Sequence, residues 1–199
     1  MAGAWQAGRY QAGRYLAGVT VGSVATVRGM TEVRRATAGD ADELVRLRSV
    51  MLAAVGGYDP VPDGPWQETA VETLRMRVAE PDGSLAAFVV DKPGTGGLAS
   101  CVVGVIESRL AGPDNPSGGT GYVFNVATDV EYRRRGYSRA CMLALLAWYQ
   151  GHGVAAVELR ASVEGEPLYL ELGFVRTSSP TMRLTVFPRQ SRTSVRWPL

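Results

Sequence analysis

Three consecutive arginines between a strand-like segment and a helix-like segment constrain this chain more than any other feature. Residues 122–128 are mostly β-branched or aromatic, which is typical of a strand, and residues 139–150 contain no proline or glycine, which favours a helix. Residues 133–135 are all arginine, followed by Gly136, where the helix should begin. A helix start presents unpaired N–H groups and the positive end of the dipole, and glycine permits close approach. The turn is therefore predicted to bind a phosphorylated ligand.

A simpler interpretation of the three arginines remains open. Runs of like charge lie most often on a solvated surface and bind nothing in particular. The position of this run between a strand and a helix start leaves the two interpretations at rough parity on the residues alone.

The charge is divided unevenly along the 199 residues. Residues 1–29 and residues 187–199 each contain three arginines and no acidic residue, so residues 30–186 hold 15 basic and 19 acidic residues, a net charge of −4 against +2 for the whole chain. Residues 1–29, rich in Ala and Gly, are predicted to form a flexible extension, and residues 30–199 a single domain. The acidic balance argues against nucleic-acid binding, leaving only binding through the basic tails as a weak alternative.

Cysteine, histidine and hydropathy patterns predict neither a metal site nor a membrane span. Cys101 and Cys141 lack metal-ligand spacing and are expected to be buried, reduced thiols, and His152 is the only histidine. No stretch approaches the roughly 18 apolar residues that a membrane span needs. We expect a cytoplasmic protein.

Hydrophobic periodicity and turn residues predict helices interleaved with strands, and hence an α/β fold with a mixed sheet. Asp40, with Glu43 three residues later, is predicted to be the N-cap of the first helix. Helices are expected after Asp40 and at residues 66–78, 139–150 and 166–172, and strands at residues 32–36, 85–91, 99–110, 122–128, 155–160, 174–176 and 181–187.

Two motifs, in this order, resemble the signatures of the GNAT N-acyltransferase superfamily. Arg133-x-x-Gly136-x-Ser138 is similar to its acyl-CoA-binding motif, with Ser138 at a position where the family has Gly or Ala. Residues 167–174, Pro-Leu-Tyr-Leu-Glu-Leu-Gly-Phe, are similar to its closing Leu-Tyr-x-x-Leu-Gly-Phe, and residues 125–128, Asn-Val-Ala-Thr, to a common form of its fourth strand. The resemblance covers about residues 30–187.

The resemblance implies an α/β (α+β) fold: a mostly antiparallel sheet flanked by helices, whose two central parallel strands splay apart at a bulge. Acetyl-CoA, the acyl donor, would lie in that opening, with its pantetheine arm along the fourth strand and its pyrophosphate on the arginine-rich turn. The Ser138 hydroxyl is expected to be able to bond a phosphate. The implied acetyl-CoA-binding residues are Val126, Ala127, Thr128, Arg133, Arg134, Arg135, Gly136, Tyr137, Ser138 and Arg139.

The resemblance also implies the chemistry. Tyr169 corresponds to the general acid that protonates the departing CoA thiolate, and the acceptor would be a primary amine of a small molecule or peptide. The family's usual carboxylate falls near Gly121 and Tyr122, so the general base is missing there. Glu107, acting through water, is one candidate, and a surface role for Glu107 is the alternative. Homodimers are common in the family, and a non-catalytic acyl-CoA-binding regulatory module is the second hypothesis for function.

Overall fold

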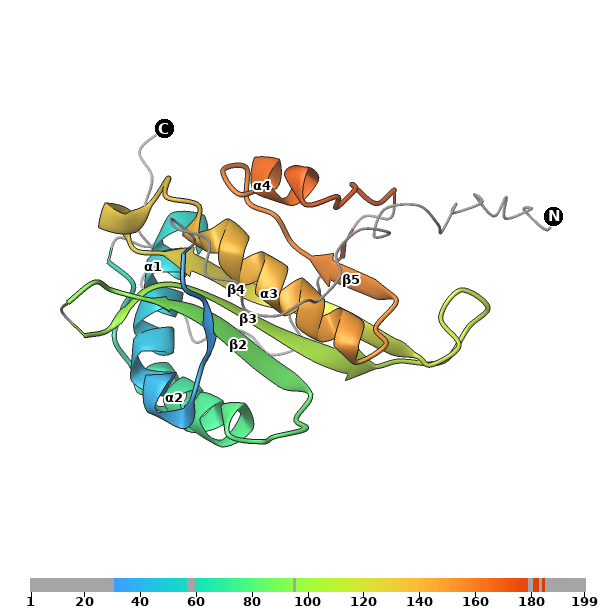
Figure 1. The fold of residues 1–199 in the computed structure, drawn as a ribbon, viewed down its shortest axis with the longest axis horizontal. Helices are drawn as coiled ribbons and strands as arrows, with labels where there is room; N and C mark the ends of the chain where they lie inside the picture. Colours follow the sequence, from blue (N-terminus) through green and yellow to red (C-terminus); the bar gives the residue numbers. More distant parts are fainter. Residues whose placement is uncertain (1–30, 57–59, 95, 179–180, 183, 185–199) are drawn as a thin grey trace.

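The computed structural model describes residues 31–56, 60–94, 96–178, 181–182 and 184, and the predicted extension 1–29 lies outside them. Within the described residues, five strands form one sheet in chain order (Figure 1). The strands are β1 Arg34–Arg35, β2 Leu85–Asp91, β3 Leu98–Ser108, β4 Gly119–Thr128 and β5 Ala156–Leu159. The helices are α1 Ala41–Gly56, α2 Pro65–Val78, α3 Tyr137–Gly151 and α4 Glu166–Glu171, with 3₁₀ turns η1 Ala38–Asp40 and η2 Val130–Tyr132. Among the strands that the structure describes, only β4 and β5 pair in parallel, so the sheet is mixed and mostly antiparallel, as predicted.

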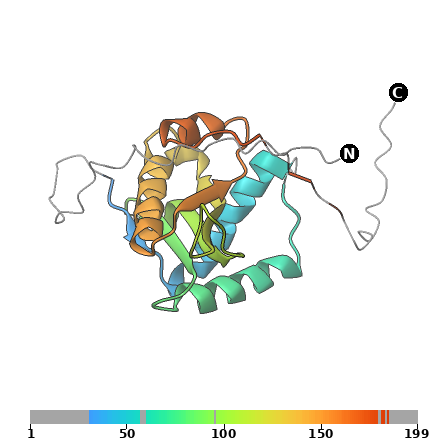
Figure 2. The ribbon, with the colours of Figure 1, turned by 90° about the vertical axis from the view of Figure 1, so that its right-hand side faces the viewer.

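Helices cover both faces of the sheet. Helices α1 and α2 lie on one face and α3 on the other, with α4 beyond the end of β5 (Figure 2). Side chains alternate along β3, so Cys101 and Val103 pack towards α1 and α2, whereas Val102 packs towards α3. Both faces of the central strands are therefore buried, which explains their nearly continuous apolar sequence.

The two parallel strands separate at a bulge, as the resemblance implies. The parallel pairing of β4 with β5 ends at Val123 and Leu159. Immediately beyond, the register of β3 against β4 shifts between Val103 and Gly104, leaving Phe124 without a partner on β3. The bulge redirects β4, so its last residues leave β5 and create an opening between the two strands.

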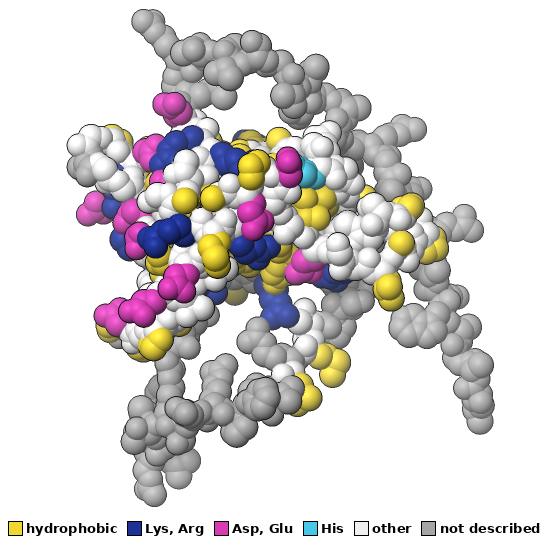
Figure 3. All heavy atoms as spheres, turned by 90° about the horizontal axis from the view of Figure 1, so that it is seen from below, with side chains coloured by type: hydrophobic (Ala, Val, Ile, Leu, Met, Phe, Trp, Pro, Cys, Tyr) yellow, Lys and Arg dark blue, Asp and Glu magenta, His cyan; other side chains and the backbone are white. Residues whose placement is uncertain are grey.

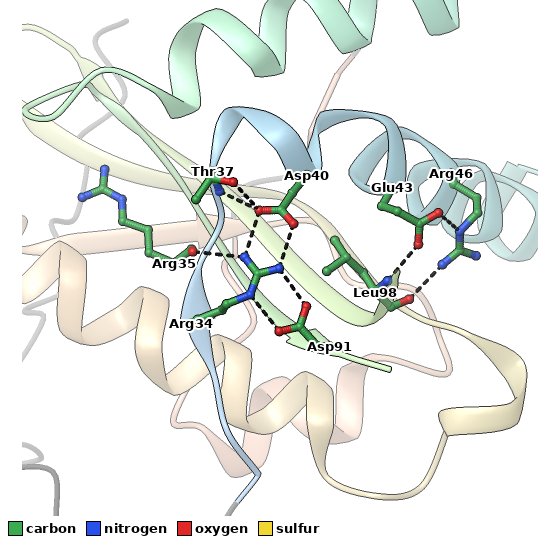
Figure 4. Close-up of polar contacts among 8 residues, drawn as sticks. All are labelled: Arg34, Arg35, Thr37, Asp40, Glu43, Arg46, Asp91 and Leu98. Carbon is green, nitrogen blue, oxygen red and sulfur yellow. Dashed lines mark hydrogen bonds and ion pairs between the residues drawn. The ribbon is translucent and has the colours of Figure 1, made fainter. Parts of the chain in front are cut away.

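The start of the first helix differs from the prediction. Asp40 is not an N-cap: it closes the η1 turn, and its Oδ2 accepts hydrogen bonds from the Thr37 N–H (2.7 Å) and Thr37 Oγ1 (2.9 Å). Thr37, itself a good capping residue, begins the turn three residues earlier. Glu43 instead accepts the Leu98 N–H (2.8 Å) and Arg46 Nε (2.7 Å), which links α1 to the start of β3 (Figure 4).

The predicted strand at residues 174–176 is wrong. This segment is irregular and runs back along α4, because Phe174 packs edge-on against the Tyr169 ring (6.0 Å between centroids) and Arg176 forms a two-pronged ion pair with Glu166 (2.6 and 2.8 Å). Most of the last predicted strand, residues 181–187, lies outside the described residues.

Arg34 joins the first strand to η1 and β2. Its guanidinium lies between two carboxylates, donating to Asp40 Oδ1 (2.7 Å) and to Asp91 Oδ2 (2.8 Å), as Figure 4 shows. The hydrogen bonds from Arg34 lower the pKa of Asp40 from its ordinary 3.8 to about 2. A depressed carboxyl pKa stabilises the fold above the ordinary pKa and loses that effect as the pH falls through the lowered value.

Wild-type protein should therefore lose about 1 kcal/mol of unfolding free energy between pH 4 and pH 2 through this group, a figure reduced for solvent screening of the partly exposed Arg34. Asp40→Asn lacks this contribution to the unfolding free energy already at pH 7. The stability curves of wild type and Asp40→Asn should therefore converge near pH 2. Urea unfolding at several pH values measures this, with the exposed Asp42→Asn as control. Parallel curves for wild type and Asp40→Asn down to pH 2 would contradict it.

Two glycines form a slot for Tyr149 of α3. Tyr149 is 1% exposed, and its hydroxyl reaches the carbonyl oxygens of Tyr122 (3.0 Å) and Val105 (3.3 Å). A Cβ atom at Gly121 would lie 2.9 Å from the Tyr149 ring, and one at Gly104 would clash with its hydroxyl. The sequence pattern places Gly104 inside a predicted strand and Gly121 just before another, without revealing that an aromatic ring occupies the space.

Gly104→Ala is therefore expected to destabilise the fold by about 2 kcal/mol, because the buried ring cannot move aside without losing its hydrogen bonds. Chemical denaturation measures the change. Gly112→Ala is the matched control, since a Cβ there meets no atom within 4 Å. Equal stability of the two variants would show that Tyr149 is free to repack.

On the face seen in Figure 3, basic and acidic side chains lie interspersed rather than gathered by sign. No helix among the described residues is long and apolar enough to span a bilayer.

Candidate acyl-donor and acceptor site

The arginine-rich turn joins η2 to α3 and has an unusual backbone. Gly136 is the N-cap of α3 in the left-handed region, with φ 79°, and Arg134 also has a positive φ of 61°. No atom lies within 4 Å of where a Cβ of Gly136 would stand, so the space in front of the helix start is open. The turn thus presents the backbone N–H groups of a helix N-terminus to an accessible surface.

Two of the three arginines shape the turn itself. Arg133 donates through Nε to the Thr128 carbonyl oxygen (3.3 Å), and Arg135 donates to the Glu131 carbonyl oxygen (3.1 Å). The Arg135 guanidinium also lies 5.0 Å from the centre of the Tyr132 ring, within cation–π range. These two exposed side chains fold back along the chain.

The other two arginines predicted to bind the ligand, Arg134 and Arg139, have no side-chain partner among the described residues. Arg134 and Arg139 are exposed, and within the described residues neither side chain makes a hydrogen bond, ion pair or ring contact. Tyr137, the first residue of α3, is half-buried and stacks on Tyr132 at 6.4 Å between centroids. Arg134 and Arg139 are the side chains free to reach a phosphate.

Arg134→Gly should raise the free energy of unfolding by about 0.5–1 kcal/mol, because a non-glycine residue in the left-handed region costs roughly 1–2 kcal/mol and glycine's extra unfolded entropy offsets only part of it. Arg134→Ala keeps the strain and should leave stability nearly unchanged. Chemical denaturation of both variants separates the backbone effect from loss of the charge. A destabilised Arg134→Gly would contradict this account.

The backbone at the end of β4 has a definite orientation. The Asp129 N–H donates to the Ala99 carbonyl oxygen (2.9 Å), and hydrogen-bonded pairs alternate along an antiparallel ladder. Ala127 therefore pairs with β3, whereas the N–H and C=O groups of Val126 and Thr128 point away from β3, into the opening beside β5. Of the three residues predicted to contact the pantetheine arm, Val126 and Thr128 thus direct backbone groups into the opening, whereas the backbone groups of Ala127 face β3.

A cavity of about 880 Å³ lies beside β5 and α4. Leu159, the last residue of β5 paired with β4, lines it. The polar and aromatic side chains around it include Glu107, Arg109, Tyr122, Glu158, Arg160, Glu166, Tyr169 and Phe174. The cavity therefore brings both predicted catalytic residues, Tyr169 and Glu107, to one space at the mouth of the strand opening.

Tyr169 is held by the packing of α4. Pro167 lies in the first turn, and Gly173, with φ 90°, follows the C-cap residue Leu172 and ends the helix, as predicted. The ring is half-buried, and its hydroxyl has no hydrogen-bond partner among the described residues. Burial raises the pKa of Tyr169, so the phenol keeps its proton at neutral pH.

Glu107 shares its arginine with a second carboxylate that the sequence analysis missed. Arg109 Nη2 lies 2.8 Å from Glu107 Oε2 and 3.4 Å from Glu158 Oε2. Glu158 is in β5, opposite Tyr122 of β4 and one residue before the two strands stop pairing, whereas Glu107 is one strand further away on β3. The sequence did contain a signal for Glu158. Apolar and polar side chains alternate along residues 155–160, and this alternation places Glu158 on the side of the strand that faces away from the α3 core.

Comparison with known proteins identifies a family and a shared fold. Residues 53–174 match the sequence model of the acetyltransferase (GNAT) family. The fold is similar to a GCN5-related N-acetyltransferase from Ralstonia eutropha JMP134, with 25% identity, a TM-score of 0.65, and coverage of 77% of this chain and 97% of that one. Among curated protein sequences, none matches.

Two further solved structures have the same fold. A predicted acetyltransferase from Clostridium acetobutylicum, solved with acetyl-CoA, has a TM-score of 0.68 and 19% identity over 79% of this chain and 97% of that one. Glucosamine-6-phosphate N-acetyltransferase from Arabidopsis thaliana has a TM-score of 0.61 and 17% identity over 77% and 97%.

Proposed function

This chain belongs to the GNAT acetyltransferase family, whose members transfer acetyl groups from acetyl-CoA, and we propose that it acetylates a primary amine of a small molecule or peptide with Tyr169 as general acid. The observation that best supports this proposal is the junction at Leu159. There β4 and β5 stop pairing, and the cavity that holds the Tyr169 side chain begins.

The donor would lie between the two separated strands. The outward backbone groups of Val126 and Thr128 supply strand-like pairing for the amides of the pantetheine arm. The pyrophosphate would sit on the N–H groups at the start of α3, with Arg134 and Arg139 adding charge-assisted contacts. The backbone N–H near Val126 is the donor that could stabilise the thioester oxygen as it gains charge.

Tyr169 suits the role of acid. The sulfur of CoA gains negative charge as it leaves, and a phenol held near the sulfur neutralises that charge by supplying a proton. The raised pKa of Tyr169 keeps it protonated at neutral pH. Its hydroxyl, without a partner among the described residues, is not tied to another acceptor.

We assign the base to Glu158 in preference to Glu107. The amine must lose a proton as it attacks, and Glu158, which lies next to the point where β4 and β5 separate, is one strand nearer to the opening than Glu107 on β3. Bringing the two reactants together supplies much of the rate, so the base need not be strong.

Release of free thiol from acetyl-CoA on addition of amines tests this function. A panel of small amines and short peptides should contain acceptors that release thiol in proportion to enzyme. Binding of acetyl-CoA without thiol release for any amine would instead favour the non-catalytic binding module.

A further inference from the structure

Three hydroxyl groups connect the end of β4 to the start of α3. Ser100 Oγ lies 3.0 Å from the Ala127 carbonyl oxygen and 2.7 Å from Thr128 Oγ1. Thr128 Oγ1 lies 2.7 Å from Ser138 Oγ. Ser100 is fully buried, while Thr128 and Ser138 are half-buried. The chain thus begins in the core and ends at the first turn of α3.

Counting protons gives one set of directions in which all three contacts are hydrogen bonds. A carbonyl oxygen only accepts, so the single Ser100 proton is donated to Ala127. Ser100 Oγ must then accept the proton of Thr128, and Thr128 Oγ1 must accept the proton of Ser138. The Ser138 hydroxyl proton therefore points into the protein, and only a lone pair faces outwards. A hydroxyl in this state cannot donate to a phosphate.

We propose that Ser138 is a positioning residue, which holds the arginine-rich turn in register with β4 and does not bond the phosphate through its hydroxyl. This inference rests on the proposed acetyl-CoA site. Thr128 is tied to the turn at two points: its carbonyl oxygen accepts from Arg133 (3.3 Å) and its hydroxyl from Ser138. Its backbone N–H faces the strand opening.

Loss of the link between Ser138 and Thr128 is expected to affect only a ligand that spans both halves of the site. The pantetheine half depends on the backbone of Val126 and Thr128, and the pyrophosphate half on the N–H groups of the turn. Each half binds its own fragment whether or not the two are in register. Acetyl-CoA must fit both at once, so loss of register reduces the gain from linking the two fragments.

Binding of three ligands to wild type and Ser138→Ala tests this. The ligands are acetyl-CoA, ADP, which carries a pyrophosphate without the arm, and S-acetylpantetheine, which carries the arm without the nucleotide. We expect Ser138→Ala to weaken acetyl-CoA by about 3–10-fold, the range for one lost hydrogen bond, and both fragments by less than about twofold. Ser138→Thr, which keeps the hydroxyl, should restore acetyl-CoA affinity.

Ser100→Ala, which removes the buried end of the chain, should give the same pattern. Ser49→Ala on α1, where the hydroxyl bonds only its own helix, is the control and should change no ligand. Equal weakening of ADP and acetyl-CoA in Ser138→Ala would mean direct phosphate contact and overturn the inference, as would unchanged acetyl-CoA affinity. If wild type binds none of the three ligands, the proposed donor site itself fails.

Discussion

Tyr169→Phe is expected to lower kcat by about 100-fold or more, the usual contribution of a positioned general acid, while acetyl-CoA affinity stays within twofold of wild type. The ring keeps its packing against Phe174, and only the proton donor is lost. Steady-state thiol release and calorimetric binding of acetyl-CoA measure the two quantities. Tyr132→Phe, on the η2 turn outside the cavity, is the matched control.

The pH dependence of Tyr169→Phe gives an independent check. In wild type the rate should fall when Tyr169 loses its proton, above the ordinary tyrosine range near pH 10, because burial raises its pKa. That alkaline decline should be absent in Tyr169→Phe. Full activity of the variant would remove Tyr169 from the mechanism.

Glu158→Gln should reduce kcat/KM about 10–100-fold at neutral pH, since a positioned base commonly contributes at least this much. Raising the pH should recover part of the loss, because more of the amine is then already deprotonated. Thiol release across a pH series measures both effects.

Glu107→Gln is the matched control for this assignment. Both glutamates bind the same arginine, Arg109, so each variant loses one ion pair of an exposed cluster. If Glu107→Gln shows the larger and pH-dependent loss, the base is Glu107 and the assignment to Glu158 is wrong.

Local sequence patterns predicted the parts of the site that lie close together in the chain. The arginine-rich turn, its helix and the Tyr169 helix are each set by a few neighbouring residues, such as Gly136 and Gly173, whose backbone angles are required by the turn. These elements depend on local propensity, capping and the family motifs.

What depends on strand register was not predictable. The direction of the Ala127 backbone groups follows from the hydrogen-bond register of β4 against β3. The bulge at Phe124 reverses which face of the sheet each earlier residue of β4 lies on. Glu158 enters the site only because β5 pairs with β4 beside Tyr122. The Ser138 hydroxyl contacts Thr128 Oγ1, ten residues earlier, at 2.7 Å.

Residues 174–176 illustrate the same limit. Their apolar and charged pattern fits a strand, but the ion pair of Arg176 with Glu166 and the packing of Phe174 on Tyr169 hold the segment against α4. The conformation of such a segment depends on the competition between its tertiary contacts and its strand propensity.

A crystal structure of the protein with acetyl-CoA tests the central claim most directly. We expect the pantetheine arm between β4 and β5 beyond Val123, paired with Val126 and Thr128, the pyrophosphate on the turn before α3, and the sulfur next to the Tyr169 hydroxyl. Acetyl-CoA bound elsewhere, or a sulfur far from Tyr169, would contradict the account.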